Sequence, residues 1–202
     1  MLALLMLLAA APEPPDTSAI LRLIGRFGAG HACPIEAEVA LTAAHVPDVS
    51  PLDREVPLWP YRFEGGGTVG VVEPQGVMSA VDLAVMRPQQ PFARWYKRAS
   101  EPPAVGERLW LLAYDWRSRK AIYADRVMSG RVLRVVAGHI MLDEEVPGGA
   151  SGSCVLNEAG DVVGVVTWGQ RTEDQRTAAV AAAVFGEWWG GAATRAVPPP
   201  VE

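Results

Sequence analysis

Short apolar runs recur along most of the chain, and turn-forming residues separate them at intervals of about 8–12 residues. Many of these runs are rich in valine and other β-branched residues, which fit a pleated sheet better than a helix. The 20 glycines and 17 prolines among the 202 residues supply the many turns that short strands need. The pattern is typical of a sandwich or barrel, and we predict an all-β fold.

The expected strands lie on either side of a proline-rich segment, residues 88–104, which is the best candidate for a linker. Strands are expected over residues 20–27, 28–35, 38–42, 68–73, 83–87, 108–114, 127–136, 139–142, 153–156 and 161–168. Residues 47–68 are expected to form loop and edge strand, and residues 157–161 a hairpin loop. The alanine-rich residues 177–184 fit a helix or a strand. The pattern alone leaves open whether the chain forms one domain or two small lobes.

Composition excludes several classes of partner. The net charge of −5 argues against binding to nucleic acid, and it offers no polybasic patch for an anionic membrane. No group of histidine, cysteine and acidic residues has the spacing of a metal site. We therefore expect neither a metal ion nor an organic cofactor.

The first 11 residues form an apolar run that ends in alanines. The run is too short to span a bilayer as a helix, and it matches the apolar core and cleavage end of a secretory signal. No Lys or Arg precedes it, and Pro12 directly follows Ala11, so a misassigned start or a tether are alternatives. We expect residues 1–15 to be a signal peptide or leader, and the protein to be secreted or periplasmic.

Three separated segments contain residues suited to nucleophilic catalysis. His45 ends the segment ALTAAH, Asp82 leads the apolar run DLAVM, and Ser151 lies in PGGASGSCV. A serine among small turn residues is exposed and has backbone N–H groups beside it, as an acyl-transfer site requires. Each residue also has a plainer explanation, namely a surface or core histidine, a turn aspartate and a turn serine. Their occurrence together, in the order His, Asp, Ser, favours a shared site.

These segments resemble those of the trypsin/chymotrypsin-like serine protease family, in its bacterial type, which uses this order of catalytic residues. The resemblance implies two packed antiparallel β-barrels with the active site between them, a last strand within residues 177–184 and a short C-terminal helix near Trp188 and Trp189. The expected domains are a leader over residues 1–15, an N-terminal lobe over 18–98, a C-terminal lobe over 99–190 and a tail over 191–202.

The resemblance also implies roles for individual residues. Ser151 would be the nucleophile, His45 the general base, and Asp82 the group that fixes the histidine tautomer. The N–H groups of Gly149 and Ser151 would form the oxyanion hole. The expected protein is a monomeric serine endopeptidase acting on polypeptides. The alternatives are a catalytically silent protease fold that binds peptides, and a structural protein in which the motifs occur by chance; His31 and His139 are expected to be surface or core residues.

Two further stretches bear on specificity. The sequence GVVTWG, residues 164–169, resembles the family segment that lines the primary pocket, so Thr167, Trp168 and Gly169 are substrate-binding candidates. Glu145 lies six residues before Ser151, and if no insertion intervenes the resemblance places it at the base of that pocket, where a carboxylate would favour Arg or Lys at the cleaved residue. The alternative is that Glu145 belongs to a solvated acidic run, residues 143–145.

The chain departs from the family at several places, of which two bear on its activation and its cross-linking. Ala150 stands where activated digestive members carry an aspartate that pairs with a new N-terminus, so activation by that salt bridge is not available. Val46 stands where the family's usual bridge beside the catalytic histidine needs a cysteine. Cys33 and Cys154 are the two cysteines; they are either unrelated buried thiols or, as the resemblance suggests, a disulfide between the lobes.

Overall fold

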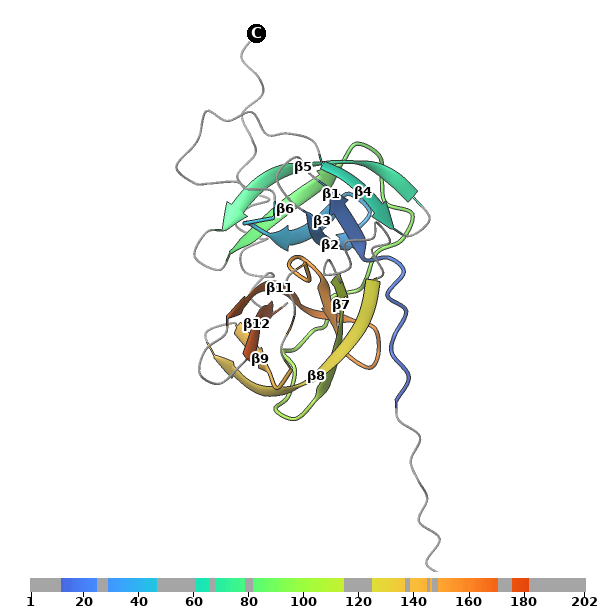
Figure 1. Cartoon of the computed structure of the whole chain (residues 1–202). Helices are drawn as coiled ribbons and strands as arrows, with labels where there is room; N and C mark the ends of the chain where they lie inside the picture. Colours follow the sequence, from blue (N-terminus) through green and yellow to red (C-terminus); the bar gives the residue numbers. More distant parts are fainter. Residues whose placement is uncertain are drawn as a thin grey trace, which may run out of the picture.

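A computed structural model describes residues 12–24, 29–46, 61–65, 68–78, 82–114, 125–136, 139–144, 146, 149–170 and 176–181. Every regular element in these residues is a β-strand. The strands form two closed antiparallel barrels that lie one above the other in Figure 1. The all-β, two-barrel expectation is confirmed. The C-terminal helix expected near Trp188 and Trp189 lies outside the described residues.

The first barrel is closed by six strands in the order β1-β2-β3-β6-β5-β4. Their bounds are β1 Leu21–Ile24, β2 Ala29–Glu36, β3 Val39–Ala43, β4 Tyr61–Gly65, β5 Thr68–Met78 and β6 Leu83–Pro88. The strand β5 runs five residues beyond its expected end at Glu73. It does so through Pro74 and Gly76, where the register against β6 shifts. A bulge at this position explains how a proline fits within the strand.

The second barrel is closed in the order β10-β11-β12-β9-β8-β7. Its strands are β7 Arg108–Tyr114, β8 Asp125–Val136, β9 His139–Leu142, β10 Cys154–Leu156, β11 Val162–Gln170 and β12 Arg176–Ala181. The alanine-rich stretch is therefore a strand as far as Ala181, and it pairs with β9 and β11; the remaining residues, 182–184, lie outside the described residues. The hairpin loop between β10 and β11 is closed by a bond from the Asn157 N–H to the Asp161 carbonyl, at 3.0 Å.

Each barrel has an apolar interior, and a third apolar cluster lies between the barrels. The cluster between them joins Leu41 and Leu83 of the first barrel to Leu156 and Val165 of the second, all four almost completely buried. Burying a Leu or Val side chain contributes roughly 1.5–3 kcal/mol. The apolar contact therefore fixes the two barrels against each other, and with them any site at their junction. The exact lobe boundaries, 18–98 and 99–190, stay a prediction.

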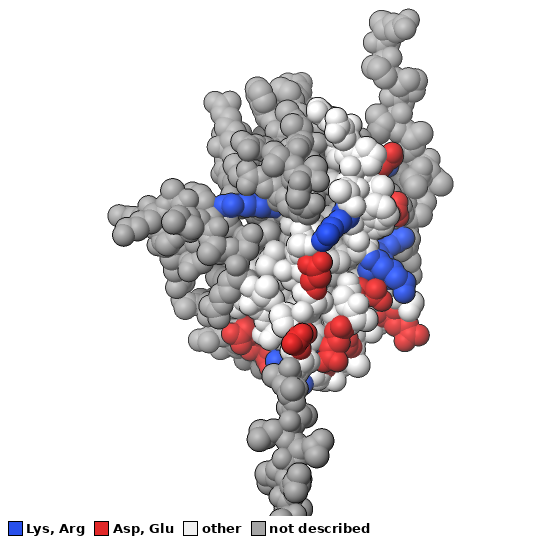
Figure 2. Space-filling model, turned by 90° about the vertical axis from the view of Figure 1, so that its right-hand side faces the viewer, with Lys and Arg blue, Asp and Glu red and all other residues white. Residues whose placement is uncertain are grey.

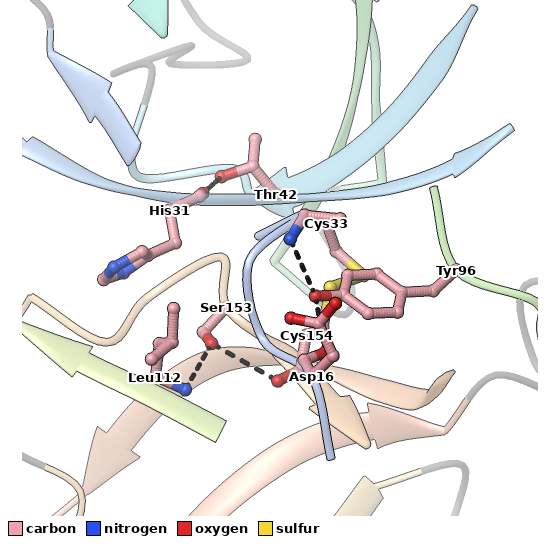
Figure 3. The surroundings of a disulfide bond; sticks show 9 residues. Asp16, His31, Cys33, Thr42, Tyr96, Leu112, Ser153 and Cys154 are labelled. Carbon is pink, nitrogen blue, oxygen red and sulfur yellow. Dashed lines mark hydrogen bonds between the residues drawn. A yellow bond between two sulfur atoms is a disulfide. The ribbon is translucent and has the colours of Figure 1, made fainter. Parts of the chain in front are cut away.

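The interface also contains a disulfide between Cys33 on β2 and Cys154 on β10 (Figure 3). The two Cα atoms are 4.9 Å apart, and both residues are fully buried. Beside the disulfide, the Tyr96 hydroxyl donates to the Asp16 carbonyl and accepts from the Ala19 N–H, each at 3.1 Å. Burial raises the pKa of Tyr96 to about 12, so the neutral phenol persists and these bonds hold the N-terminal segment to the linker.

On the face shown in Figure 2, acidic and basic side chains are interspersed over the described residues, and no continuous basic patch appears among them. No helix within the described part of the chain is long and apolar enough to cross a membrane. The same residues contain no group of three or more histidine, cysteine or acidic side chains that could hold a metal ion.

Candidate active site

The pairing of β3 with β6 brings His45 and Asp82 together. The antiparallel register places Ala43 opposite Leu83, so the residues after β3 lie beside the residue before β6. The Ala44 N–H donates to the Asp82 carbonyl at 2.9 Å, and the His45 N–H donates to Asp82 Oδ1 at 3.0 Å. Asp82 has a φ of 53°, a left-handed conformation that aspartate tolerates better than most residues. Backbone contacts thus orient the Asp82 carboxylate independently of the His45 imidazole.

The three candidate catalytic side chains form a continuous hydrogen-bonded chain at the junction of the barrels. His45 Nδ1 lies 2.6 Å from Asp82 Oδ2, and His45 Nε2 lies 2.9 Å from Ser151 Oγ. A carboxylate only accepts, so Nδ1 carries the proton and the neutral Nε2 is left to accept the serine proton. The His45 side chain is 49% exposed, so a substrate can reach it.

Ser151 lies in a turn that leads into β10, and glycines allow the turn to form. Gly149 has a φ of 95° and Gly152 a φ of 84°, both in the region that side chains disfavour. Ala150 between them is fully buried in the core of the second barrel. No other described residue offers an acceptor to the N–H of Gly149 or Ser151. Within the described part of the chain, the N–H groups of Gly149 and Ser151 are therefore available to bind a ligand as candidate oxyanion donors.

Ser153 has a structural part that the sequence did not indicate. Its fully buried hydroxyl accepts from the Leu112 N–H at 2.9 Å and lies 3.3 Å from the Cys154 carbonyl, to which it can donate. Figure 3 shows this hydroxyl between β7 and β10. A glycine at this position would leave the Leu112 N–H without its acceptor. Only the small size of Ser153 was visible in the sequence, not the strand beside it.

The structure describes some of the residues proposed for specificity and not others. The Thr167 side chain is fully buried, so only its backbone could meet a substrate. Trp168 and Gly169 lie on β11, but the Trp168 side chain is outside the described set, as is all of Glu145. The pocket-base prediction for Glu145 therefore stays a prediction.

The disulfide gives a stability prediction, because it joins positions 121 residues apart in the chain. Replacing both cysteines, Cys33→Ala with Cys154→Ala, is expected to lower the free energy of unfolding by about 3 kcal/mol, since the unfolded chain regains the freedom that the cross-link removes. Urea unfolding under non-oxidising handling measures the loss. The reduced wild type is the control and should match the double variant; a variant that unfolds at the wild-type urea concentration would contradict the prediction.

The arrangement of two six-stranded barrels, with these side chains where they meet, defines the class of chymotrypsin-like proteins. The chain belongs to the family of trypsin-like peptidase domains, whose model matches residues 30–165. The fold and family are those of serine peptidases. Among curated proteins, none matches the sequence significantly.

Solved structures of bacterial serine proteases share the fold. A Glu endopeptidase in complex with MPD is 17% identical, with 93% of this chain and 95% of that chain covered, at a TM-score of 0.73. The active form of Rv3671c protease from M. tuberculosis is 16% identical, covering 92% and 84%, at 0.69. The serine endoprotease from Yersinia pestis is 15% identical, covering 89% and 64%, at 0.71. At such identities the likeness extends to the fold alone.

Proposed function

We propose that the protein is a serine endopeptidase that cleaves polypeptides through an acyl-enzyme on Ser151. The observation that carries the proposal is the hydrogen-bonded chain from Asp82 through His45 to Ser151, at 2.6 and 2.9 Å. These distances are within the reach required for a nucleophile, its base and the group that orients the base. The partial exposure of His45 leaves room for a substrate on the same side.

In the first half of the reaction, Ser151 Oγ attacks the scissile carbonyl while its proton passes to His45 Nε2. The tetrahedral intermediate collapses when His45 returns that proton to the departing amine, which leaves an ester on Ser151. In the second half, His45 takes a proton from water, the hydroxide attacks the ester, and Ser151 regains its proton as the acid leaves. Asp82 keeps its charge throughout and stabilises the imidazolium at each stage.

The oxyanion of both intermediates would be bound by the N–H groups of Gly149 and Ser151. One such donor contributes about 3–4 kcal/mol to transition-state stabilisation in comparable sites. The substrate backbone would lie along β11. Beyond Val166 the described strands pair with β11 on one side only, where Trp168 to Gln170 face β12. The described strands therefore leave the other side of β11 open for an extended substrate peptide to pair as an added strand. This open side supports the binding roles proposed for the backbone of Thr167, Trp168 and Gly169.

The buried disulfide supports a location in an oxidising compartment, because such bonds persist in secreted and periplasmic proteins and are rare in the cytosol. We include this location in the proposal. Assay under reducing and non-reducing conditions therefore forms part of any test of activity.

A fluorophosphonate probe tests the proposed nucleophile. The probe is expected to add once to the wild type, as an intact-mass shift, and not to Ser151→Ala, because only a serine activated by a base attacks phosphorus at a useful rate. Ser18→Ala, at an exposed serine away from the site, is the matched control and should label like the wild type. A wild type that binds peptides but takes up no probe would overturn the proposal in favour of a silent peptide-binding protein.

A further inference from the structure

The strand β2 of the first barrel crosses directly over the nucleophile turn of the second. The backbone N–H of His31 donates to the Ser151 carbonyl at 2.8 Å. The ring of the same residue reaches the Gly149 carbonyl, 2.8 Å from Nδ1 and 118 residues away in sequence. One residue therefore binds the carbonyls on both sides of the peptide that joins Ala150 to Ser151.

The protonation of the His31 ring follows from this contact. A carbonyl oxygen only accepts, so Nδ1 must carry the proton and donate it. The His31 side chain is fully buried, and a hydrogen bond in such a place is stronger than one exposed to water. The strand is fixed in turn, because the Thr42 hydroxyl donates to the His31 carbonyl at 2.7 Å (Figure 3).

These bonds restrict the turn where it must be rigid for catalysis. Peptide groups are planar, so holding the Gly149 and Ser151 carbonyls fixes the planes of two peptides. The peptide that supplies the Ser151 N–H lies between them and has little freedom left. Ala150, the residue inside the turn, is apolar and can make no polar side-chain contact of its own. The bonds that hold the Gly149 and Ser151 carbonyls both come from His31 in the other barrel.

We propose that His31 is a positioning residue: its Nδ1–H holds the Gly149 carbonyl and thereby orients the Ser151 N–H, one of the two proposed oxyanion donors. The inference rests on the function proposed above. In this chain β2 would hold the turn in place, as the salt bridge to an aspartate at the position of Ala150 does in activated digestive members of the family. The turn is consequently set when the barrels pack, without a separate activation step.

Three substitutions separate positioning from packing. His31→Asn places an amide N–H near the position of Nδ1, His31→Gln places it near that of Nε2, and His31→Leu removes it at similar volume. Each variant is assayed for kcat and KM on a peptide cleaved by the wild type, with active sites counted by fluorophosphonate uptake. Per active site, kcat is expected to fall on the order of 10²-fold in the Leu and Gln variants, as for misplaced catalytic groups generally. KM should change little, and the Asn variant should recover most of the loss.

Several results would overturn the inference. Equal losses in the Asn and Leu variants would do so, as would a fall in the number of active sites with kcat per site unchanged, since either indicates packing alone. If the Leu variant does not fold, the comparison of Gln with Asn decides. A wild type in which ¹⁵N NMR finds His31 unprotonated at Nδ1 would also contradict it. If the wild type reacts with the fluorophosphonate probe and the variants have an unaltered kcat, only this inference is removed. If the wild type does not react with the probe, the proposed function is removed as well.

Discussion

Asp82→Asn is expected to lower kcat by about 10⁴-fold, the effect of forcing the wrong tautomer on a triad histidine. The backbone explains why. The His45 N–H donates to Asp82 Oδ1, so an asparagine will keep its carbonyl oxygen there and turn its NH₂ toward His45 Nδ1. Nδ1 must then accept, the proton moves to Nε2, and Nε2 can no longer take the proton of Ser151. Steady-state kinetics on a cleaved peptide measures the loss.

Asparagine is chosen because it should change the activity without changing the stability of the fold. Asp82 has a positive φ, which asparagine tolerates as aspartate does, so the free energy of unfolding should change little. Glu158→Gln, at an exposed position in the hairpin loop, removes the same charge far from the site and should leave kcat unaltered. A loss of less than about 10-fold in the Asp82 variant would show that the carboxylate does not set the tautomer.

The sequence predicted most of the strands because their signal is local. Short apolar or β-branched runs bounded by turn residues can be recognised without knowledge of the partner strand. The alanine-rich residues 177–184 were ambiguous for the same reason: alanine fits either structure, and only the pairing of β12 with β9 and β11 decides. The continuation of β5 through Pro74 was missed because its bulge depends on β6.

The three triad candidates could be named from their flanking motifs, but their juxtaposition could not. It depends on the register of β3 against β6 and on the packing of one barrel on the other. His31 shows the limit most clearly. In the sequence it is an unremarkable histidine expected to be a surface or core residue, and no local pattern connects it with a carbonyl 118 residues away.

The cysteines were an intermediate case. Their pairing could be suggested only through the family resemblance, and the structure joins Cys33 to Cys154. Val46, next to His45, packs instead into the interior of the first barrel. The cross-link of this chain therefore joins β2 to the start of β10, just after the turn that holds Ser151, and β2 also makes hydrogen bonds to that turn.

Gly152→Ala is expected to lower the free energy of unfolding by about 4 kcal/mol, because it separates β2 from the nucleophile turn. A Cβ on Gly152 would overlap the carbonyl oxygen of His31 and the hydroxyl of Thr42. Neither atom can move freely, since the carbonyl is backbone and accepts the bond from that same hydroxyl. The strand must therefore shift as a whole, and the bonds from His31 to the turn weaken with it. Urea unfolding and active-site titration should both report the change.

Gly106→Ala is the matched control, because it isolates the backbone term. Gly106 has a φ of 85°, against 84° for Gly152, but a Cβ there would meet nothing within 4 Å. Gly106→Ala should therefore lower the free energy of unfolding by only about 1 kcal/mol, from the strain of an alanine in a left-handed conformation. Its kcat per active site should be unchanged. The difference between the two variants measures how closely the barrels approach at the nucleophile turn. Equal losses in the two would contradict the prediction, because the turn would then accept the added Cβ without displacing β2.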